Sequence, residues 1–351
     1  MGKVKGNKPS YQKKTKKQEK KEPTKQQKNV GVHSLYISIF VAVILVIFFV
    51  GRWMMAIMNG YFNAYVKMGD SFEEAYANVG DLDVTEEEET LLLEAGKEWD
   101  YFTSSRLCDQ LTMTASDGTE LTGYLYDEGS DLTLVVIPQL GVTGTDDFLP
   151  GTYVNEETGC NILLLDVRCQ GESGGEYFSY GYYEKQDLAD WLEYMTDSYG
   201  EQSYLIWGCG TGANTALFAE AAGLLDGNVL GIIAESPYGS LHEVAYKHLF
   251  DWYTIPSIPF LSAIEWRVNH SNAGFTMADT NLNNTLSEAN CDKMVLFLTS
   301  DEDTYILPEW TQEAYDAYSG EKELLSGTGS HGTVATTKQG EILEWIQECI
   351  H

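Results

Sequence analysis

The chain has 351 residues, and its 53 acidic side chains outnumber its 22 Lys and Arg to give a formal net charge of −31. This length suits one large α/β domain with attached segments. The charge is uneven: eleven lysines and two acidic residues lie before residue 29, so the tail carries +9 and the remainder −40. Such an acidic main domain argues against nucleic acid as a partner.

The first 58 residues predict a tail and a membrane anchor. Residues 1–34 are rich in Lys and poor in apolar side chains, which predicts a disordered cytoplasmic tail. Residues 35–58 are almost continuously apolar and reach the twenty or so residues that a membrane-spanning helix needs. Arg52 interrupts this stretch, and we expect its side chain to snorkel to the far interface beside Trp53.

We interpret residues 35–58 as a signal anchor rather than a cleaved signal peptide. The basic region before it is too long for a signal peptide, and no small-x-small cleavage site follows it. The Lys-rich flank should remain inside the cell, so the acidic domain is predicted to be extracytoplasmic on a single-pass anchor. Membrane lipid is therefore the first predicted partner, through the anchor.

Residues 59–105 predict a helical juxtamembrane spacer. One helical pattern begins at Ser71, and a second begins at Thr85, where Glu88 three residues later fits a capping box. We expect the spacer to dock on the domain that follows.

Residues 106–351 alternate between strand and helix patterns. Strands are predicted at 107–114, 121–126, 132–137, 161–167, 204–207, 229–234 and 294–299, helices at 184–195 and 340–350, and a loop at 326–332. This alternation predicts an α/β fold with a mostly parallel sheet covered by helices on both faces. Residues 238–292 interrupt it and predict an aromatic-rich helical lid over the carboxyl ends of the strands, where α/β proteins bind ligands.

The turn after strand 204–207 organises the functional prediction. It reads Gly208-Cys209-Gly210-Thr211-Gly212 and precedes a helix rich in small residues. This is the layout of the nucleophile elbow, G-x-S-x-G, in which a serine lies on a sharp strand-to-helix turn. Here the serine position holds Gly210.

Several further motifs occur in the order typical of one family. They are the hairpin 116–121, the turn Asp166 to Gly175, the helix start 181–188, the strand end Glu235-Ser236-Pro237-Tyr238, and Gly274-Phe275 in the predicted lid. Together they resemble the α/β-hydrolase family, specifically membrane-anchored extracytoplasmic members related to serine aminopeptidases and esterases. The resemblance extends from about residue 106 to the C-terminus and implies an α/β-hydrolase fold preceded by one transmembrane helix.

The resemblance also implies roles for individual residues. His331 matches the family's general base and Asp303 the acid that orients it. Glu235 is the alternative acid, because some hydrolases place the acid at the end of that strand. The backbone N–H groups of Thr211 and Val142 match the donors of the oxyanion hole.

Three positions depart from the family pattern: Gly210 replaces the serine, Leu140 replaces a histidine, and Cys169 replaces a glycine. We therefore predict a catalytically impaired pseudo-hydrolase that binds a small molecule, peptide or partner in the pocket under the lid. A structural envelope protein whose pocket has no role is a plainer possibility. The alternative is an active ester or peptide hydrolase with a non-standard nucleophile such as Cys209. Cys209 lies one residue before the apex, so its side chain should point away from His331.

The cysteines give no sign of a metal or cofactor. They are single residues without zinc spacing, and their pairing cannot be read from the sequence. The six are Cys108, Cys160, Cys169, Cys209, Cys291 and Cys349. No metal and no cofactor is predicted.

Overall fold

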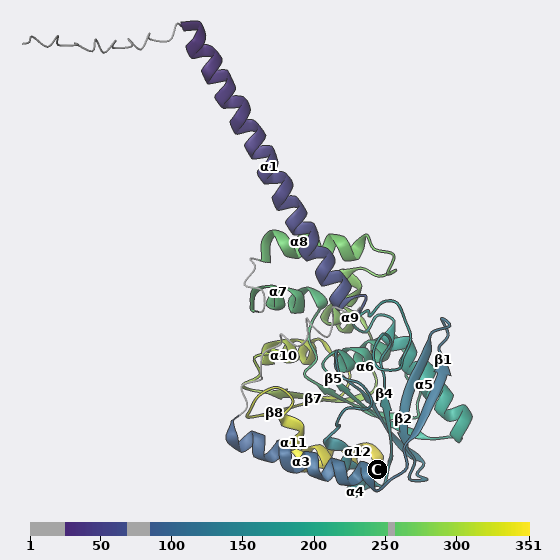
Figure 1. The fold of residues 1–351 in the computed structure, drawn as a ribbon. Helices are drawn as coiled ribbons and strands as arrows, with labels where there is room; N and C mark the ends of the chain where they lie inside the picture. The colour runs from purple at the N-terminus through teal and green to yellow at the C-terminus, as the bar shows by residue number, and fades with distance from the viewer. Residues whose placement is uncertain (1–24, 69–84, 252–256) are drawn as a thin grey trace, which may run out of the picture. The chain divides into compact units, whose positions relative to one another are not determined.

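The computed structural model describes residues 25–68, 85–251 and 257–351 (Figure 1). It comprises two compact units, residues 1–53 and 54–351, which are described separately. The described part of the first unit is the beginning of helix α1 (Lys25–Tyr65).

Helix α1 is long and apolar enough to span a membrane, with a mean hydropathy of 2.7 over its most apolar window. Its apolar side chains from Leu35 to Val50 are exposed. The helix already begins at Lys25, ten residues before the predicted start of the apolar segment, so residues 25–34 are helical rather than disordered. Lys and Gln are good helix formers, so the helix can extend backward from the apolar segment.

The last turns of α1 belong to the core of the second unit. Tyr61, Phe62 and Tyr65 are at most 5% exposed, and the Tyr180 hydroxyl donates a 2.9 Å hydrogen bond to the Tyr65 carbonyl. The Arg267 guanidinium lies 3.8 Å from the centre of the Phe62 ring. The start of the predicted spacer is thus an integral part of the domain.

Helix α3 (Glu86–Ser104) forms the second described part of the predicted spacer. The capping box between Thr85 and Glu88 is present, as predicted. Trp99 and Phe102 stack against each other and pack on Tyr126, which attaches α3 to the sheet. The helical pattern predicted from Ser71 lies outside the described residues.

The second unit is built on an eight-stranded sheet with the order β1-β2-β4-β3-β5-β6-β7-β8. The first two strands form the predicted hairpin, β2 is antiparallel to β4, and the remaining pairs are parallel. The strands are β1 (Asp109–Thr114), β2 (Glu120–Tyr126), β3 (Leu132–Ile137), β4 (Asn161–Leu165), β5 (Ser203–Cys209), β6 (Val229–Glu235), β7 (Met294–Ser300) and β8 (Lys322–Gly327). The central strands are almost wholly buried, as expected for parallel strands covered on both faces.

Helices cover both faces of this sheet, which confirms the predicted fold class (Figure 1). One core cluster contains Trp191 of α5 (Glu184–Tyr199) and Leu217 of α6 (Thr211–Ala221). The other contains Trp99 of α3, Val154 of α4 (Pro150–Thr158) and Trp345 of α12 (Gln339–Ile350).

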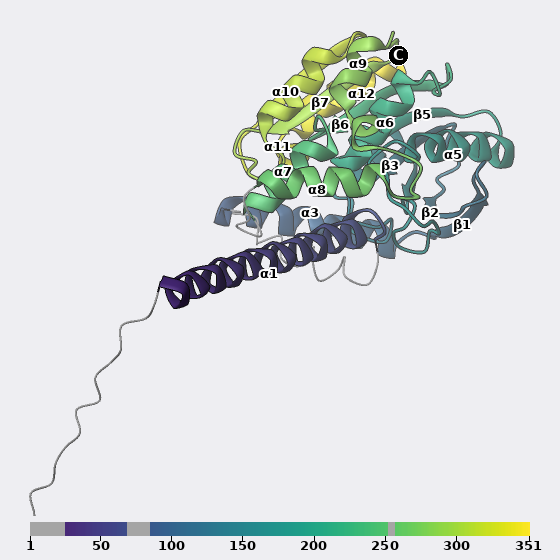
Figure 2. The same cartoon turned by 90° about the horizontal axis from the view of Figure 1, so that it is seen from above.

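The described part of segment 238–292 is mainly helical, as predicted. It contains α7 (Leu241–Asp251), α8 (Ser257–Asn269), the 3₁₀ helix η1 (Met277–Thr280) and α9 (Leu282–Glu288). Helices α7 and α8 lie side by side (Figure 2). Of its aromatic residues, Phe275 packs on Tyr182 and Tyr183, whereas Trp252 and Tyr253 lie outside the described residues.

The elements that were not predicted include α4, α10 (Pro308–Ala317) and strand β8. The predicted loop 326–332 is partly wrong, because Ser326 and Gly327 pair with β7 as the end of β8. Strand β8 is the edge of the sheet and is only partly buried, so its sequence lacks the apolar run of the central strands. The four-residue helix α11 (Val334–Thr337) follows the remaining loop.

Candidate functional site

The turn between β5 and α6 has the strained backbone of a nucleophile elbow. Gly210 has φ 51° and ψ −110°, a conformation that glycine adopts far more readily than other residues. The neighbouring glycines permit close packing: a Cβ on Gly212 would lie 2.0 Å from the Ile137 carbonyl oxygen, and one on Gly208 2.4 Å from the Gly212 carbonyl oxygen. The sequence therefore folds here into a tight strand-to-helix turn whose apex has no side chain.

The structure brings His331 and Asp303 together. Asp303 follows β7, His331 follows β8, and the imidazole Nδ1 lies 2.6 Å from Asp303 Oδ2. The other carboxylate oxygen, Oδ1, accepts 2.8 Å hydrogen bonds from the N–H groups of Tyr305 and Ile306. The Asp303 side chain is buried, so these contacts fix both the carboxylate and the imidazole ring.

The far side of the imidazole faces Gln139, a residue that the sequence analysis did not select. Gln139 follows β3, which pairs with β5, and its Oε1 lies 3.0 Å from His331 Nε2. An imidazolium donates from Nε2 to this oxygen, whereas a neutral imidazole that donates from Nδ1 needs the amide turned so that its NH₂ donates. In either state the Gln139 amide occupies the nitrogen that receives the serine proton in a catalytic triad. No sequence motif marks Gln139, because its contact with His331 joins residues that are far apart in the sequence.

One of the two predicted oxyanion donors is already in use. The Val142 N–H donates a 3.1 Å hydrogen bond to the Gln139 carbonyl oxygen. Thr211 is the first residue of α6, so its N–H has no acceptor within the helix. Thr211 is thus the better placed of the two to receive a negative oxygen.

Glu235, the alternative acid, contacts Cys209 and Trp207. Its Oε2 accepts a 3.0 Å hydrogen bond from Trp207 Nε1 and a 3.5 Å contact from the Cys209 thiol. Burial raises the pKa of Glu235 above its ordinary value. The carboxylate hydrogen-bonded to His331 is that of Asp303 rather than Glu235.

Cys209, the predicted alternative nucleophile, is the partner of Glu235 in this 3.5 Å contact. Burial, together with the nearby Glu235 carboxylate, raises the pKa of the Cys209 thiol well above its ordinary value. A reactive cysteine needs the opposite, an electropositive setting that favours the thiolate. All six cysteines of the chain are free thiols in the structure.

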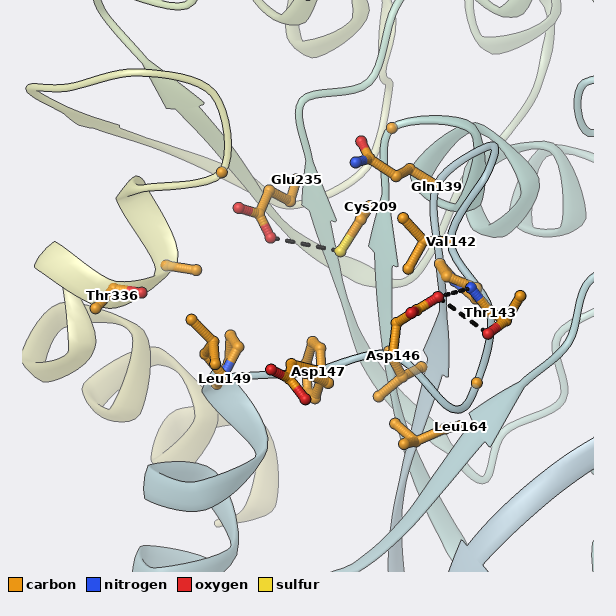
Figure 3. A pocket seen from close by; sticks show the side chains of 18 of the residues that line it. Gln139, Val142, Thr143, Asp146, Asp147, Leu149, Leu164, Cys209, Glu235 and Thr336 are labelled. Atoms are coloured by element: carbon orange, nitrogen blue, oxygen red, sulfur yellow. Dashed lines mark hydrogen bonds between the residues drawn. The ribbon is translucent and has the colours of Figure 1, made fainter. Parts of the chain in front are cut away.

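A cavity of about 260 Å³ lies beside the turn (Figure 3). Gly210, His331, Gln139, Cys209 and Glu235 all line it, together with the segment 142–150 and the start of α11. None of the described residues between 238 and 292 lines it, so the pocket under the lid stays a prediction. Most of the 142–150 segment, which follows β3 and leads into α4, lines the cavity.

The three departures from the family pattern lie in different surroundings. Gly210 lines the cavity, whereas Leu140 and Cys169 are not among its lining residues. Leu140 is 5% exposed in the core, and Cys169 lies in a turn with φ 65°. Within the described residues, no group of three or more His, Cys, Asp or Glu side chains is placed to hold a metal ion.

Comparison with solved structures identifies the fold. The esterase Pf2001 of Pyrococcus furiosus is 22% identical, with a TM-score of 0.55 over 70% of this chain and 92% of that one. The acetyl xylan esterase of Paenibacillus sp. R4 is 15% identical, with a TM-score of 0.52 over 79% of this chain and 98% of that one. The second unit therefore has an α/β-hydrolase-like fold.

Sequence comparison gives a second similarity, which covers less of the chain. The uncharacterized protein YqkD of Bacillus subtilis (strain 168) is 29% identical over 194 residues, or 55% of this chain. The match spans 62% of that protein, which is less than two thirds of its length. No known protein-family model matches the sequence.

Proposed function

We propose that this chain is a membrane-anchored, extracytoplasmic pseudo-hydrolase: an α/β-hydrolase fold without a nucleophile, which binds a small molecule or peptide in the cavity beside Gly210. In this proposal Gly210 stands where active members of the fold have their serine. His331 and Asp303 are then the remaining two members of the triad.

The contact between His331 and Gln139 carries the proposal. A general base works only if its nitrogen reaches the proton of a nucleophile. Here the nitrogen that would do so lies 3.0 Å from an amide oxygen, and the adjacent glycine supplies no hydroxyl. The Cys209 thiol is paired with Glu235, so it does not support the alternative of an active cysteine hydrolase.

Two features support the anchoring. Helix α1 is of sufficient length and apolarity to span a membrane, and eleven lysines precede residue 29. Positive charge beside a spanning segment favours the cytoplasmic side. We therefore place the N-terminus inside the cell and the acidic domain outside it.

A fluorophosphonate probe tests the absence of a nucleophile. We expect the full chain in lipid nanodiscs to show no labelling and no turnover of short acyl esters, and His331→Ala to behave identically. Labelling that His331→Ala abolishes would overturn the proposal. A thiol-reactive probe run in parallel tests the alternative, which requires esterase activity that Cys209→Ser removes.

A further inference from the structure

We infer that the cavity binds a small organic cation, with an ammonium group held by Glu235 and by the acidic mouth, and a compact apolar body against the walls. This inference rests on the proposed function, since it treats the cavity as a ligand site rather than a reaction site. It adds the chemical class of the ligand.

The ionisable groups around the cavity are almost all acidic. Asp146, Asp147 and Glu235 all line it, and the two aspartates, whose side chains are exposed, are called the acidic mouth here (Figure 3). No Lys or Arg is among the described residues that line it, and the His331 ring is held by Asp303. An excess of carboxylates in a recess attracts cations and repels anions.

Glu235 provides the independent sign of a ligand. It is only 6% exposed, and both of its hydrogen-bond contacts fall on Oε2. Among the described residues the second oxygen, Oε1, has no hydrogen-bond donor, although the side chain lines the cavity. Oε1 is not among the fully buried atoms that lack a partner, so it is accessible from the cavity that Glu235 lines, and an ammonium N–H is a type of donor that would pair with it.

The apolar side chains that line the cavity indicate the size and character of the part of the ligand that does not carry the ammonium group. Apolar side chains line the space between Glu235 and the mouth, among them Val142, Phe148, Leu149 and Leu164. The volume of about 260 Å³ is just below the roughly 300–1,000 Å³ typical of pockets for drug-sized ligands. A single ring or short branched chain that carries one ammonium group fits this description.

Three probes of one shape and different charge test the inference: benzylamine, benzyl alcohol and benzoate. We expect calorimetry on the full chain in nanodiscs at neutral pH, with empty nanodiscs as the blank, to show benzylamine binding about tenfold tighter than benzyl alcohol. Benzoate should show no binding. Equal affinity for benzylamine and benzyl alcohol, or no binding of benzylamine, would overturn the inference.

Charge-neutralising variants locate the site. Glu235→Gln keeps an acceptor for Trp207 and should weaken benzylamine binding about tenfold without weakening that of benzyl alcohol. Asp147→Asn, at an exposed position, should act in the same direction and serves if Glu235→Gln does not fold. The matched control is Glu344→Gln on the exposed side of α12, which removes a carboxylate away from the cavity and should change nothing.

The outcomes separate this inference from the proposed function. If benzyl alcohol binds as well as benzylamine and no fluorophosphonate labelling occurs, the inference fails and the pseudo-hydrolase stands. If labelling occurs, the proposed function fails whatever the charge preference of the cavity. Loss of benzylamine binding in Glu344→Gln equal to that in Glu235→Gln would also overturn the inference.

Discussion

The backbone N–H of Ser330 donates a 2.8 Å hydrogen bond to Oε1 of Glu88, a buried carboxylate on helix α3. The other oxygen of Glu88 accepts 2.7 Å hydrogen bonds from the N–H and the hydroxyl of Thr85. One carboxylate therefore caps α3 and holds the loop in which Ser330 precedes His331. Helix α3 is thereby tied to the candidate site.

Replacement of Glu88 by Gln should destabilise the domain in a pH-dependent manner. The hydrogen bonds from Thr85 and Ser330 lower the pKa of Glu88, so the ionised form stabilises the fold above the ordinary carboxyl pKa of about 4.3. That stabilisation is lost as the pH falls through the lowered folded-state pKa. At pH 7 we expect a loss of about 1–3 kcal/mol in Glu88→Gln, because hydrogen bonds to a charged group are lost.

The thermal midpoint, followed by tryptophan fluorescence, measures this effect at several pH values. The gap between the parent chain and Glu88→Gln should narrow as the pH falls below about 4. Glu89→Gln is the control, because Glu89 is exposed on the next position of the same helix. A gap that stays constant down to the lowest accessible pH would contradict the assignment.

The sequence was sufficient for the framework because its central strands are continuous apolar runs. Strand β3 coincides with its prediction, and the hairpin, the elbow turn and α12 are within a few residues of theirs. Edge strand β8 lacks such a run. The short helix α4 has no side-chain cap at its start, and its signals, Pro150 at the first position and Gly159 at the end, were not used in the prediction.

The site was less accessible to sequence reasoning. His331 and Asp303 each follow a strand in the expected order, so their proximity was foreseeable from the resemblance. Gln139 follows β3 and His331 follows β8, strands that are not neighbours in the sheet, so their contact depends on how the loops after these strands fold, which no local spacing encodes. That the 142–150 segment lines the cavity likewise depends on how the loop after β3 folds.

Gly210→Ser alone should not restore esterase activity. A Cβ at position 210 would lie 3.2 Å from Gln139 Cβ and 3.6 Å from Gln139 Oε1, so the amide competes with a new hydroxyl for the imidazole. Gly210→Ser combined with Gln139→Gly supplies a hydroxyl and removes the competing amide. This double variant should give slow fluorophosphonate labelling. Activity should remain low, because loss of one oxyanion donor costs about 10²–10³ in rate and the Val142 N–H is engaged.

The comparison of single and double variants decides the role of Gln139. Further replacement of His331 by Ala in the double variant should abolish the labelling. If Gly210→Ser alone is labelled as fast as the double variant, Gln139 does not block the imidazole.

Loss of Arg168 should strongly destabilise the domain. The Arg168 Nε donates a hydrogen bond to Asp187 at 2.7 Å, and its Nη2 donates one to Asp117 at 3.1 Å. Burial raises the pKa of Asp187 to about 6 although Asp187 is paired with Arg168. Arg168→Met leaves a buried carboxylate without its partner and should cost about 3–5 kcal/mol, whereas Arg168→Met with Asp187→Leu should recover most of it. Thermal midpoints compare the variants with Lys338→Met, which breaks an exposed pair and should cost less than about 1 kcal/mol. A double variant no more stable than Arg168→Met would contradict this account.

The elbow glycines differ sharply in what they tolerate. A Cβ on Gly212 would lie 2.0 Å from the Ile137 carbonyl oxygen and 2.9 Å from that of Pro138, so Gly212→Ala requires β3 or α6 to move. We expect a loss of more than about 4 kcal/mol and little folded protein. Gly210→Ala meets no backbone atom within 4 Å but holds a positive φ, and should cost about 1–3 kcal/mol. Gly227→Ala, with nothing within 4 Å, is the neutral control, and thermal midpoints rank the three. If Gly212→Ala proves as stable as Gly227→Ala, the close approach of α6 to β3 is not as described and the elbow geometry, on which the placement of Gly210 rests, fails with it.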